Sequence, residues 1–129
     1  MSTSLPERYA LLRELFEQFG VPIGSFQALQ HRMVEMLMAA EQSRSMLYRA
    51  VCEAQQQEAT APQTVAAMKA LVARHGRYVG EEAIQIHGGM GMTDELDIGH
   101  YVKRLMIINQ SFGNGDSALR EFSQARYAA

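Results

Sequence analysis

Proline is the residue that most constrains this chain, because a proline inside a helix removes a hydrogen bond and breaks the helix. Prolines stand only at positions 6, 22 and 62. In the long stretches between and after them, apolar residues recur at steps of three and four, as in Phe26, Leu29 and Met33. This spacing places such residues on one face of an α-helix. No stretch alternates between polar and apolar residues for long enough to predict a strand, so we expect long helices.

The breaks in this pattern predict four principal helices, near residues 5–18, 25–58, 63–87 and 95–112, and a short last segment from Ser117 to about Arg126. Gly20 is placed to cap the end of the first helix, Ser25 the start of the second, and Thr93 or Asp94 the start of the fourth. A chain of 129 residues with this pattern is expected to be all-α, an antiparallel four-helix bundle. We expect its seam side chains to be buried: Leu29, Met33, Leu37, Leu47, Val72, Val79, Leu105 and Ile108.

The amino-acid composition limits the kinds of partner that this chain is expected to bind. Lys and Arg total 12 against 14 Asp and Glu, so the chain lacks the positive charge that a nucleic-acid partner requires. No apolar run approaches the ~18 residues that would cross a membrane, and the first residues do not resemble a signal peptide. A single cysteine, Cys52, fits a reducing, cytoplasmic environment and is expected to serve packing. We find no convincing metal-ligand spacing, since a pair such as His31 and Glu35 is common on helix faces.

The most unusual motif is the segment 85–92, which reads Gln-Ile-His-Gly-Gly-Met-Gly-Met. Its simplest interpretation is a helix end capped by glycines. It differs from a dinucleotide-binding fingerprint, which opens a helix after a strand, whereas this motif closes a helix. A glutamine and a histidine beside glycines that admit a ligand to the backbone also form a plausible docking point for the polar edge of a cofactor.

A second motif covers residues 19–30, Phe-Gly-Val-Pro-Ile-Gly-Ser-Phe-Gln-Ala-Leu-Gln. It reads as a turn followed by a helix start. Gln27 and Gln30 lie three residues apart in the first turns of that helix, where their amides could bind a ligand or simply face water.

With both motifs at this spacing, from Gln27 to Gln85, the chain resembles the C-terminal helical domain of the acyl-CoA dehydrogenase family. The segment 83–96 is most similar to bacterial members of the type called pimeloyl-CoA dehydrogenase small subunit. The resemblance extends from residue 19 to about residue 116. We therefore expect a helical domain over 19–129, with residues 1–18 as a poorly matching N-terminal helix of the same bundle.

The resemblance implies a flavoprotein oxidoreductase that removes an α proton and a β hydride from an acyl-CoA. It implies that this domain forms the oligomer core, in a homo-oligomer or with a partner acyl-CoA dehydrogenase subunit, and supplies one wall of an FAD site. The positions that it assigns to FAD contact are Gln27, Gln85, Ile86, His87, Gly88 and Gly89, and Gly113 is assigned to the substrate.

The chain also departs from the family. The arginine expected three residues before Phe-Gly is Phe16, which removes one charged contact to the FAD pyrophosphate. The family's catalytic glutamate position holds Phe112, which cannot accept a proton, and Asp116 is only a weak substitute. The two domains that precede this one in the family are absent from the 129 residues. We therefore expect an inactive chain when isolated, and keep as an alternative a non-catalytic helical module that oligomerises or supports a partner.

The remaining histidines are expected to have ordinary roles. His75 lies on the seam of the third helix and is predicted to be a satisfied core residue, whereas His31 and His100 are predicted to face solvent or a partner. Tyr101, Lys103 and Arg104 could meet a CoA phosphate, but a solvated helix face is the interpretation that we prefer.

Overall fold

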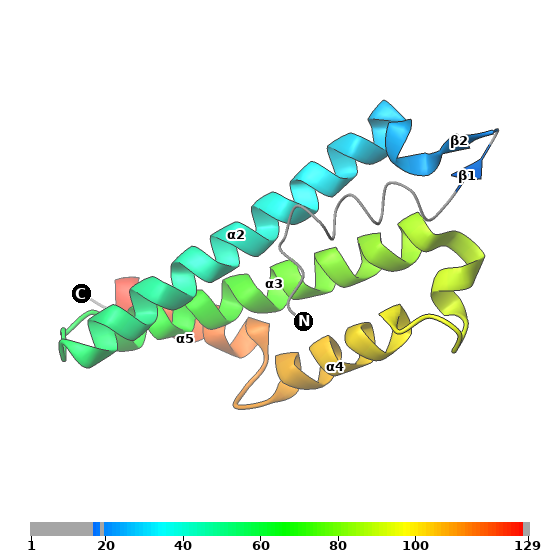
Figure 1. Cartoon of the computed structure of the whole chain (residues 1–129). Coiled ribbons are helices and arrows are strands. Elements are labelled where there is room, and N and C mark those ends of the chain that lie inside the picture. Colours follow the sequence, from blue (N-terminus) through cyan, green and yellow to red (C-terminus); the bar gives the residue numbers. More distant parts are fainter. Residues whose placement is uncertain (1–16, 19, 128–129) are drawn as a thin grey trace. The chain divides into compact units, whose positions relative to one another are not determined.

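The computed structural model describes residues 17–18 and 20–127 (Figure 1). The described residues fall into two units that divide after Glu35, so that the longest helix, α2 (Gln27–Gln55), begins in the first unit and continues in the second. Each unit is considered by itself. The expected domain boundary between residues 18 and 19 stays a prediction.

The first unit contains a short hairpin where a helix end was predicted. Strand β1 (Glu17–Gln18) pairs antiparallel with β2 (Val21–Pro22). The predicted helix near 5–18 is therefore wrong at residues 17–18, and its remainder lies outside the described residues. Gly20 does not cap a helix but turns the hairpin with φ of +76°, a conformation that glycine adopts without steric cost.

A 3₁₀ turn, η1 (Ile23–Ser25), leads from the hairpin into α2. Ser25 was predicted to cap α2, but its hydroxyl donates to the carbonyl oxygen of Pro22 at 2.7 Å. The side-chain amide of Gln30 donates to the carbonyl oxygen of Gly24 at 2.8 Å and so ties the first turns of α2 to the 3₁₀ turn. These local bonds replace the predicted serine cap.

The second unit is built around α3 (Ala61–His87), against which α4 (Ile98–Gln110) packs near one end and α5 (Gly115–Tyr127) near the other (Figure 1). The predicted helices 25–58, 63–87 and 95–112 are confirmed with small shifts at their ends. The last segment, expected to be short, is a full helix of 13 residues that makes the most extensive contacts with α3. Among the described residues, α2 to α5 are therefore the four helices of the all-α fold.

The buried residues of this unit are small. They are Ala39, Ala50, Ala61, Thr64, Ala66, Gly80, Gly91, Val102 and Ala118. A Cβ atom on Gly80 would stand 3.3 Å from a methyl group of Val102, which shows how closely α3 and α4 approach. The prediction of a buried seam of large side chains is wrong in this respect: Leu47 and Ile108 are 45% and 42% exposed, and the other six are half-buried. Small residues occupy the contacts because they allow the backbones to come together, and this leaves the larger side chains on the flanks.

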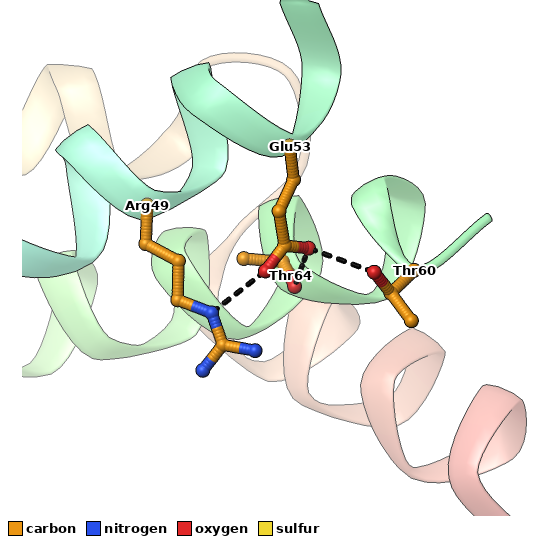
Figure 2. Close-up of polar contacts among 4 residues, drawn as sticks. All are labelled: Arg49, Glu53, Thr60 and Thr64. Carbon is orange, nitrogen blue, oxygen red and sulfur yellow. Dashed lines mark hydrogen bonds and ion pairs between the residues drawn. The ribbon is translucent and has the colours of Figure 1, made fainter. Parts of the chain in front are cut away.

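The carboxylate of Glu53 bonds to residues on both sides of the connection between α2 and α3 (Figure 2). It accepts hydrogen bonds from the hydroxyls of Thr60 and buried Thr64, at 3.0 and 2.6 Å, and from Nε of Arg49 at 2.7 Å. These bonds stabilise the charged form, so the pKa of Glu53 lies below its usual range, chiefly because of Thr64. The connection is thereby fixed by side chains on both helices.

His75 links α2 and α3 at their middle. Its Nδ1 lies 2.9 Å from the carbonyl oxygen of Ala39 and 3.0 Å from the hydroxyl of Ser43, which itself donates to the same carbonyl at 2.8 Å. The prediction that His75 has hydrogen-bond partners is confirmed, but its side chain is half-buried and does not lie in the core. By contrast, Cys52 is exposed, so the expectation that it serves packing is wrong.

The start of α4 carries no side-chain cap. Asp97 occupies the cap position without a capping hydrogen bond, and Thr93, one of the two predicted caps, donates its hydroxyl to the carbonyl oxygen of Met90 instead. Within the described residues, no helix is both long and apolar enough to span a membrane.

Candidate functional site

The C-terminal end of α3 turns sharply at Gly88. Its φ of +58° lies in the region that favours glycine, and its N–H bonds to the carbonyl oxygen of Gln85, which ends the helix as predicted. A second 3₁₀ turn, η2 (Gly88–Met92), follows and packs back on α3. The backbone N–H and hydroxyl of Thr93 both bond to the carbonyl oxygen of Met90 and close this turn.

The three glycines Gly88, Gly89 and Gly91 of this turn differ in backbone angle and in the space around them. A Cβ atom on buried Gly91 would stand 2.8 Å from the carbonyl oxygen of Ile84, so the fold requires a glycine there. Gly88 is required for its backbone angle. Gly89 is exposed, its φ lies outside the left-handed region, and a Cβ atom on it would meet nothing within 4 Å. The structure of the chain itself therefore gives no reason for a glycine at position 89.

Three side chains precede this turn. Gln85 is exposed and makes no side-chain hydrogen bond to the described part of the chain, whereas Ile86 and His87 are half-buried. Nδ1 of His87 donates to the carbonyl oxygen of Ala83 at 2.7 Å and holds the ring along the helix end. The fold thus brings the predicted residues Gln85 to Gly89 together at one end of α3, with Gln85 and Gly89 open to solvent.

Gln27, the remaining residue predicted to contact a cofactor, belongs to the first unit. It is the first residue of α2, is exposed, and makes no side-chain hydrogen bond with any described residue. Gln30, which the sequence alone could not distinguish from it, uses its amide within the first unit. Of the two glutamines, Gln27 is therefore the one with an available amide.

The α4–α5 turn carries the residues predicted near the substrate. Phe112 is 105% exposed with φ of +57°, and Gly113 follows it with φ of +89°. Asp116 is exposed in the first turn of α5. Tyr101, Lys103 and Arg104 lie exposed on α4. His31 and His100 are exposed as predicted, and no group of three metal-binding side chains occurs within residues 17–18 and 20–127.

Sequence reasoning missed a groove between α3 and the α4–α5 region. It encloses about 540 Å³ and is lined by alanines of α3, by Leu119 and Phe122 of α5, and by Arg74 and Gln110 at polar positions. Asn109, whose buried Oδ1 has no hydrogen-bond partner among the described residues, also lines it. No residue of the segment 85–89 belongs to this groove. Alanine at every third position of α3 (Ala67, Ala70 and Ala73) was the signal that could have indicated it.

Sequence reasoning also missed Lys69 of α3. Its ammonium group donates to the carbonyl oxygens of Ile108 and Ser111, at 3.0 and 2.9 Å, at the C-terminal end of α4. A single cation in the apolar run Met68-Lys69-Ala70-Leu71 was the available signal.

Comparisons with known proteins agree on one family. The family described as "Acyl-CoA dehydrogenase, C-terminal domain" matches residues 8–125. Acyl-CoA dehydrogenase IpdE2 of Mycolicibacterium smegmatis is 41% identical over 88 residues, which are 67% of this chain and 26% of that protein. L-prolyl-[peptidyl-carrier protein] dehydrogenase of a Serratia species is 39% identical over 82 residues, 64% of this chain and 21% of that protein.

Among solved structures, the FAD complex of PigA superposes with a TM-score of 0.83 at 28% identity, covering 93% of this chain and 31% of PigA. The chain thus spans about a quarter of the length of the curated relatives and about a third of PigA.

Proposed function

Because the chain belongs to the acyl-CoA dehydrogenase family, as its C-terminal domain, we propose that it serves a flavin-dependent α,β-dehydrogenation of an acyl-CoA. In this proposal it forms part of the oligomer core and one wall of an FAD site, and acts only with the domains that its longer relatives carry. The exposed glycine at position 89 is the observation that supports this most strongly.

Gly89 supports the proposal because its missing side chain serves no purpose within the chain. A residue there could carry a Cβ atom without strain or contact. Glycines of this kind allow a ligand to approach the backbone closely. Gln85, one turn earlier, offers an amide that both donates and accepts, with no bond to the described chain that would have to break first. Together they suit the polar edge of a cofactor.

The available residues fit FAD as neutral hydrogen-bonding groups. In the second unit, Gln85 and the backbone of Gly88 and Gly89 would hold it, with Ile86 and His87 beside them, and Gln27 of the first unit is a separate candidate contact. When bound, FAD supplies the acceptor for the hydride that leaves the acyl group. These groups carry no positive charge for the pyrophosphate, and position 16, where the family has an arginine, is Phe16. The isolated chain is therefore expected to bind FAD only weakly.

Proton abstraction is the step that the chain does not supply. Phe112 stands at the position of the family's base and has no group that accepts a proton. Asp116 is exposed in the first turn of α5, four residues after Phe112. These observations favour the second candidate function, a non-catalytic module that supports a partner subunit holding the base.

A partner is also suggested by the surface of the second unit. Large apolar side chains that are more than half exposed include Met38, Tyr48, Tyr101, Met106, Ile107 and Leu119. Exposed apolar area of this kind drives association. We propose a homo-oligomer or a complex with another acyl-CoA dehydrogenase subunit, in a cytoplasmic setting that suits an exposed, unpaired Cys52.

The test is an NMR titration of the ¹⁵N-labelled chain with FAD, which detects binding even at millimolar dissociation constants. We expect the amide shifts to change at residues 85–89 and at Gln27. A substitution of Gly89→Leu, which meets open space in the chain, should abolish the shifts at 85–88 and leave the fold intact. Gly99→Leu is the matched control, since a Cβ atom on Gly99 also meets nothing within 4 Å and Gly99 lies on α4.

Shifts that cluster elsewhere, for example along the groove lined by Arg74 and Gln110, would contradict the proposed site. Shifts at 85–88 that survive Gly89→Leu would contradict the role of the glycine.

A further inference from the structure

The α4–α5 turn displays an aromatic side chain that the chain does not use for its own folding. Phe112 is 105% exposed, so its ring buries no apolar surface. Its φ of +57° is the left-handed conformation, in which the Cβ atom of any residue other than glycine is crowded. The exposed ring therefore contributes no folding free energy, and the left-handed conformation costs some.

Hydrogen bonds fix the α4–α5 turn at both of its ends. On the α4 side, Lys69 of α3 donates to the carbonyl oxygens of Ile108 and Ser111 at the C-terminal end of the helix, and the oxygen of Ile108 also accepts the N–H of Ser111. The positive charge also suits the negative end of the helix dipole. On the α5 side, Oδ1 of Asn114 accepts the N–H of Ser117 at 2.8 Å, and the hydroxyl of Ser117 donates to the carbonyl oxygen of Asn114 at 2.8 Å.

Such bracing explains how an unfavourable conformation persists. A left-handed phenylalanine on an unsupported turn would relax, because no packing holds its ring. Residues kept in sparsely populated conformations by their surroundings cluster at ligand contacts. The bonds of Lys69 come from a residue 39 and 42 positions away in sequence, so they depend on the packing of α3 against α4.

We propose that Lys69 is a positioning residue that holds the α4–α5 turn so that the ring of Phe112 contacts the acyl chain of the substrate. This inference rests on the proposed function, in which position 112 is that of the family's base. An aromatic ring there offers apolar surface to an acyl chain and nothing to the polar coenzyme A portion.

The test uses the ¹⁵N-labelled chain, and its first measurement needs no ligand. In the unmodified chain the backbone order parameters of residues 111–114 should be near 0.85, and Lys69→Met should lower them below about 0.6. Lys69→Arg, which keeps a charged donor, should preserve most of the order. Lys103→Met is the matched control, because Lys103 is an exposed lysine on α4 without a side-chain bond to the described chain. Circular dichroism of each variant must show that the helices are intact.

The second measurement compares hexanoyl-CoA with coenzyme A, each titrated to about 5 mM, where even weak contacts are detected. Hexanoyl-CoA should shift the amides of residues 111–113, coenzyme A should not, and Lys69→Met should weaken the hexanoyl-CoA response several-fold. In Phe112→Asn, which retains a residue tolerated in the left-handed region, the response should vanish.

Unchanged order parameters in Lys69→Met would overturn the positioning role. Equal shifts with coenzyme A alone, or no shift at 111–113 with hexanoyl-CoA, would overturn the contact with the acyl chain. The FAD shifts at residues 85–89 are read separately, so failure of this inference is distinguishable from failure of the proposed function.

Discussion

Replacing Gly91 by alanine should destabilise the chain, whereas the same replacement at Gly89 should not. The new Cβ atom at position 91 would stand 2.8 Å from the carbonyl oxygen of Ile84, 3.2 Å from its Cα and 3.1 Å from Cβ of His87. Ordinary contacts are 3.4–4 Å, so the 3₁₀ turn must move several tenths of an ångström away from α3. At position 89 the new atom meets nothing within 4 Å.

The expected magnitudes follow from these distances. Overpacking of this kind costs about 1–3 kcal/mol, and the loss of backbone freedom in the unfolded chain returns about 0.4–1 kcal/mol for Gly→Ala. Gly91→Ala should therefore lose about 1–2 kcal/mol, which lowers the melting temperature by roughly 4–10 °C in a domain of this size. In Gly89→Ala only the loss of backbone freedom in the unfolded chain remains, so this variant should be as stable as the unmodified chain or more stable by up to about 1 kcal/mol.

Thermal and urea unfolding, followed by circular dichroism at 222 nm, measures both variants. If Gly91→Ala is as stable as the unmodified chain, the close packing of η2 on the end of α3 is wrong. If Gly89→Ala is destabilised as strongly as Gly91→Ala, position 89 has a role in folding, and the argument that its glycine serves a ligand fails.

Four further predictions concern acid stability, strain, assembly and activity. The pKa of Glu53 is lowered in the folded chain, so its hydrogen bonds stabilise the fold above the unfolded pKa and lose this effect as the pH falls through the folded pKa. The difference in urea midpoint between the unmodified chain and Glu53→Gln should therefore shrink from pH 7 to about pH 3. A difference that stays constant with pH would contradict this prediction. Phe112→Asn should stabilise the chain by up to about 1 kcal/mol in urea unfolding, because asparagine tolerates the left-handed conformation and no packing is lost; a destabilised variant would show that the ring does pack. Sedimentation at micromolar concentration should show a dimer or tetramer, and a strict monomer would count against the exposed apolar side chains as an interface. The isolated chain should not reduce an electron acceptor with any acyl-CoA, and Phe112→Glu should not restore turnover; activity of the unmodified chain would require another base, beginning with Asp116.

The helices could be predicted from the sequence because their signals are local. The apolar spacing of three and four, the break at residues 56–60 and the glycines after His87 each act within a few residues, and α2, α3 and α4 follow them closely. The hairpin at residues 17–22 was missed because two-residue strands are too short to show an alternating pattern. The length of α5 was underestimated because its stability comes from contacts with α3, which local sequence does not contain.

The residues that form the core could not be predicted from the spacing of the apolar residues. Periodicity marks the face of a helix but not the distance at which another helix approaches it, and here the approach is set by small residues such as Gly80 and Ala118. Large seam residues such as Leu47 are left partly exposed.

The candidate site shows the same division between local and distant signals. The motif identified residues 85–89. The three glycines differ in backbone angle and in the space around each one, and Gln27 differs from Gln30 in its hydrogen bonds, which the sequence does not show. Lys69 was missed because its acceptors lie 39 and 42 residues further along the chain.

The flavin content of a chimera tests most directly whether the turn at residues 88–89 forms part of an FAD site. This chain would replace the matching segment of PigA, whose structure contains FAD, and absorbance near 450 nm would be measured per polypeptide after purification. We expect the chimera and its Gly99→Leu variant to retain FAD, and the Gly89→Leu variant to lose most of it while keeping its helical content. Equal flavin content in the Gly89→Leu and unmodified chimeras would contradict the account.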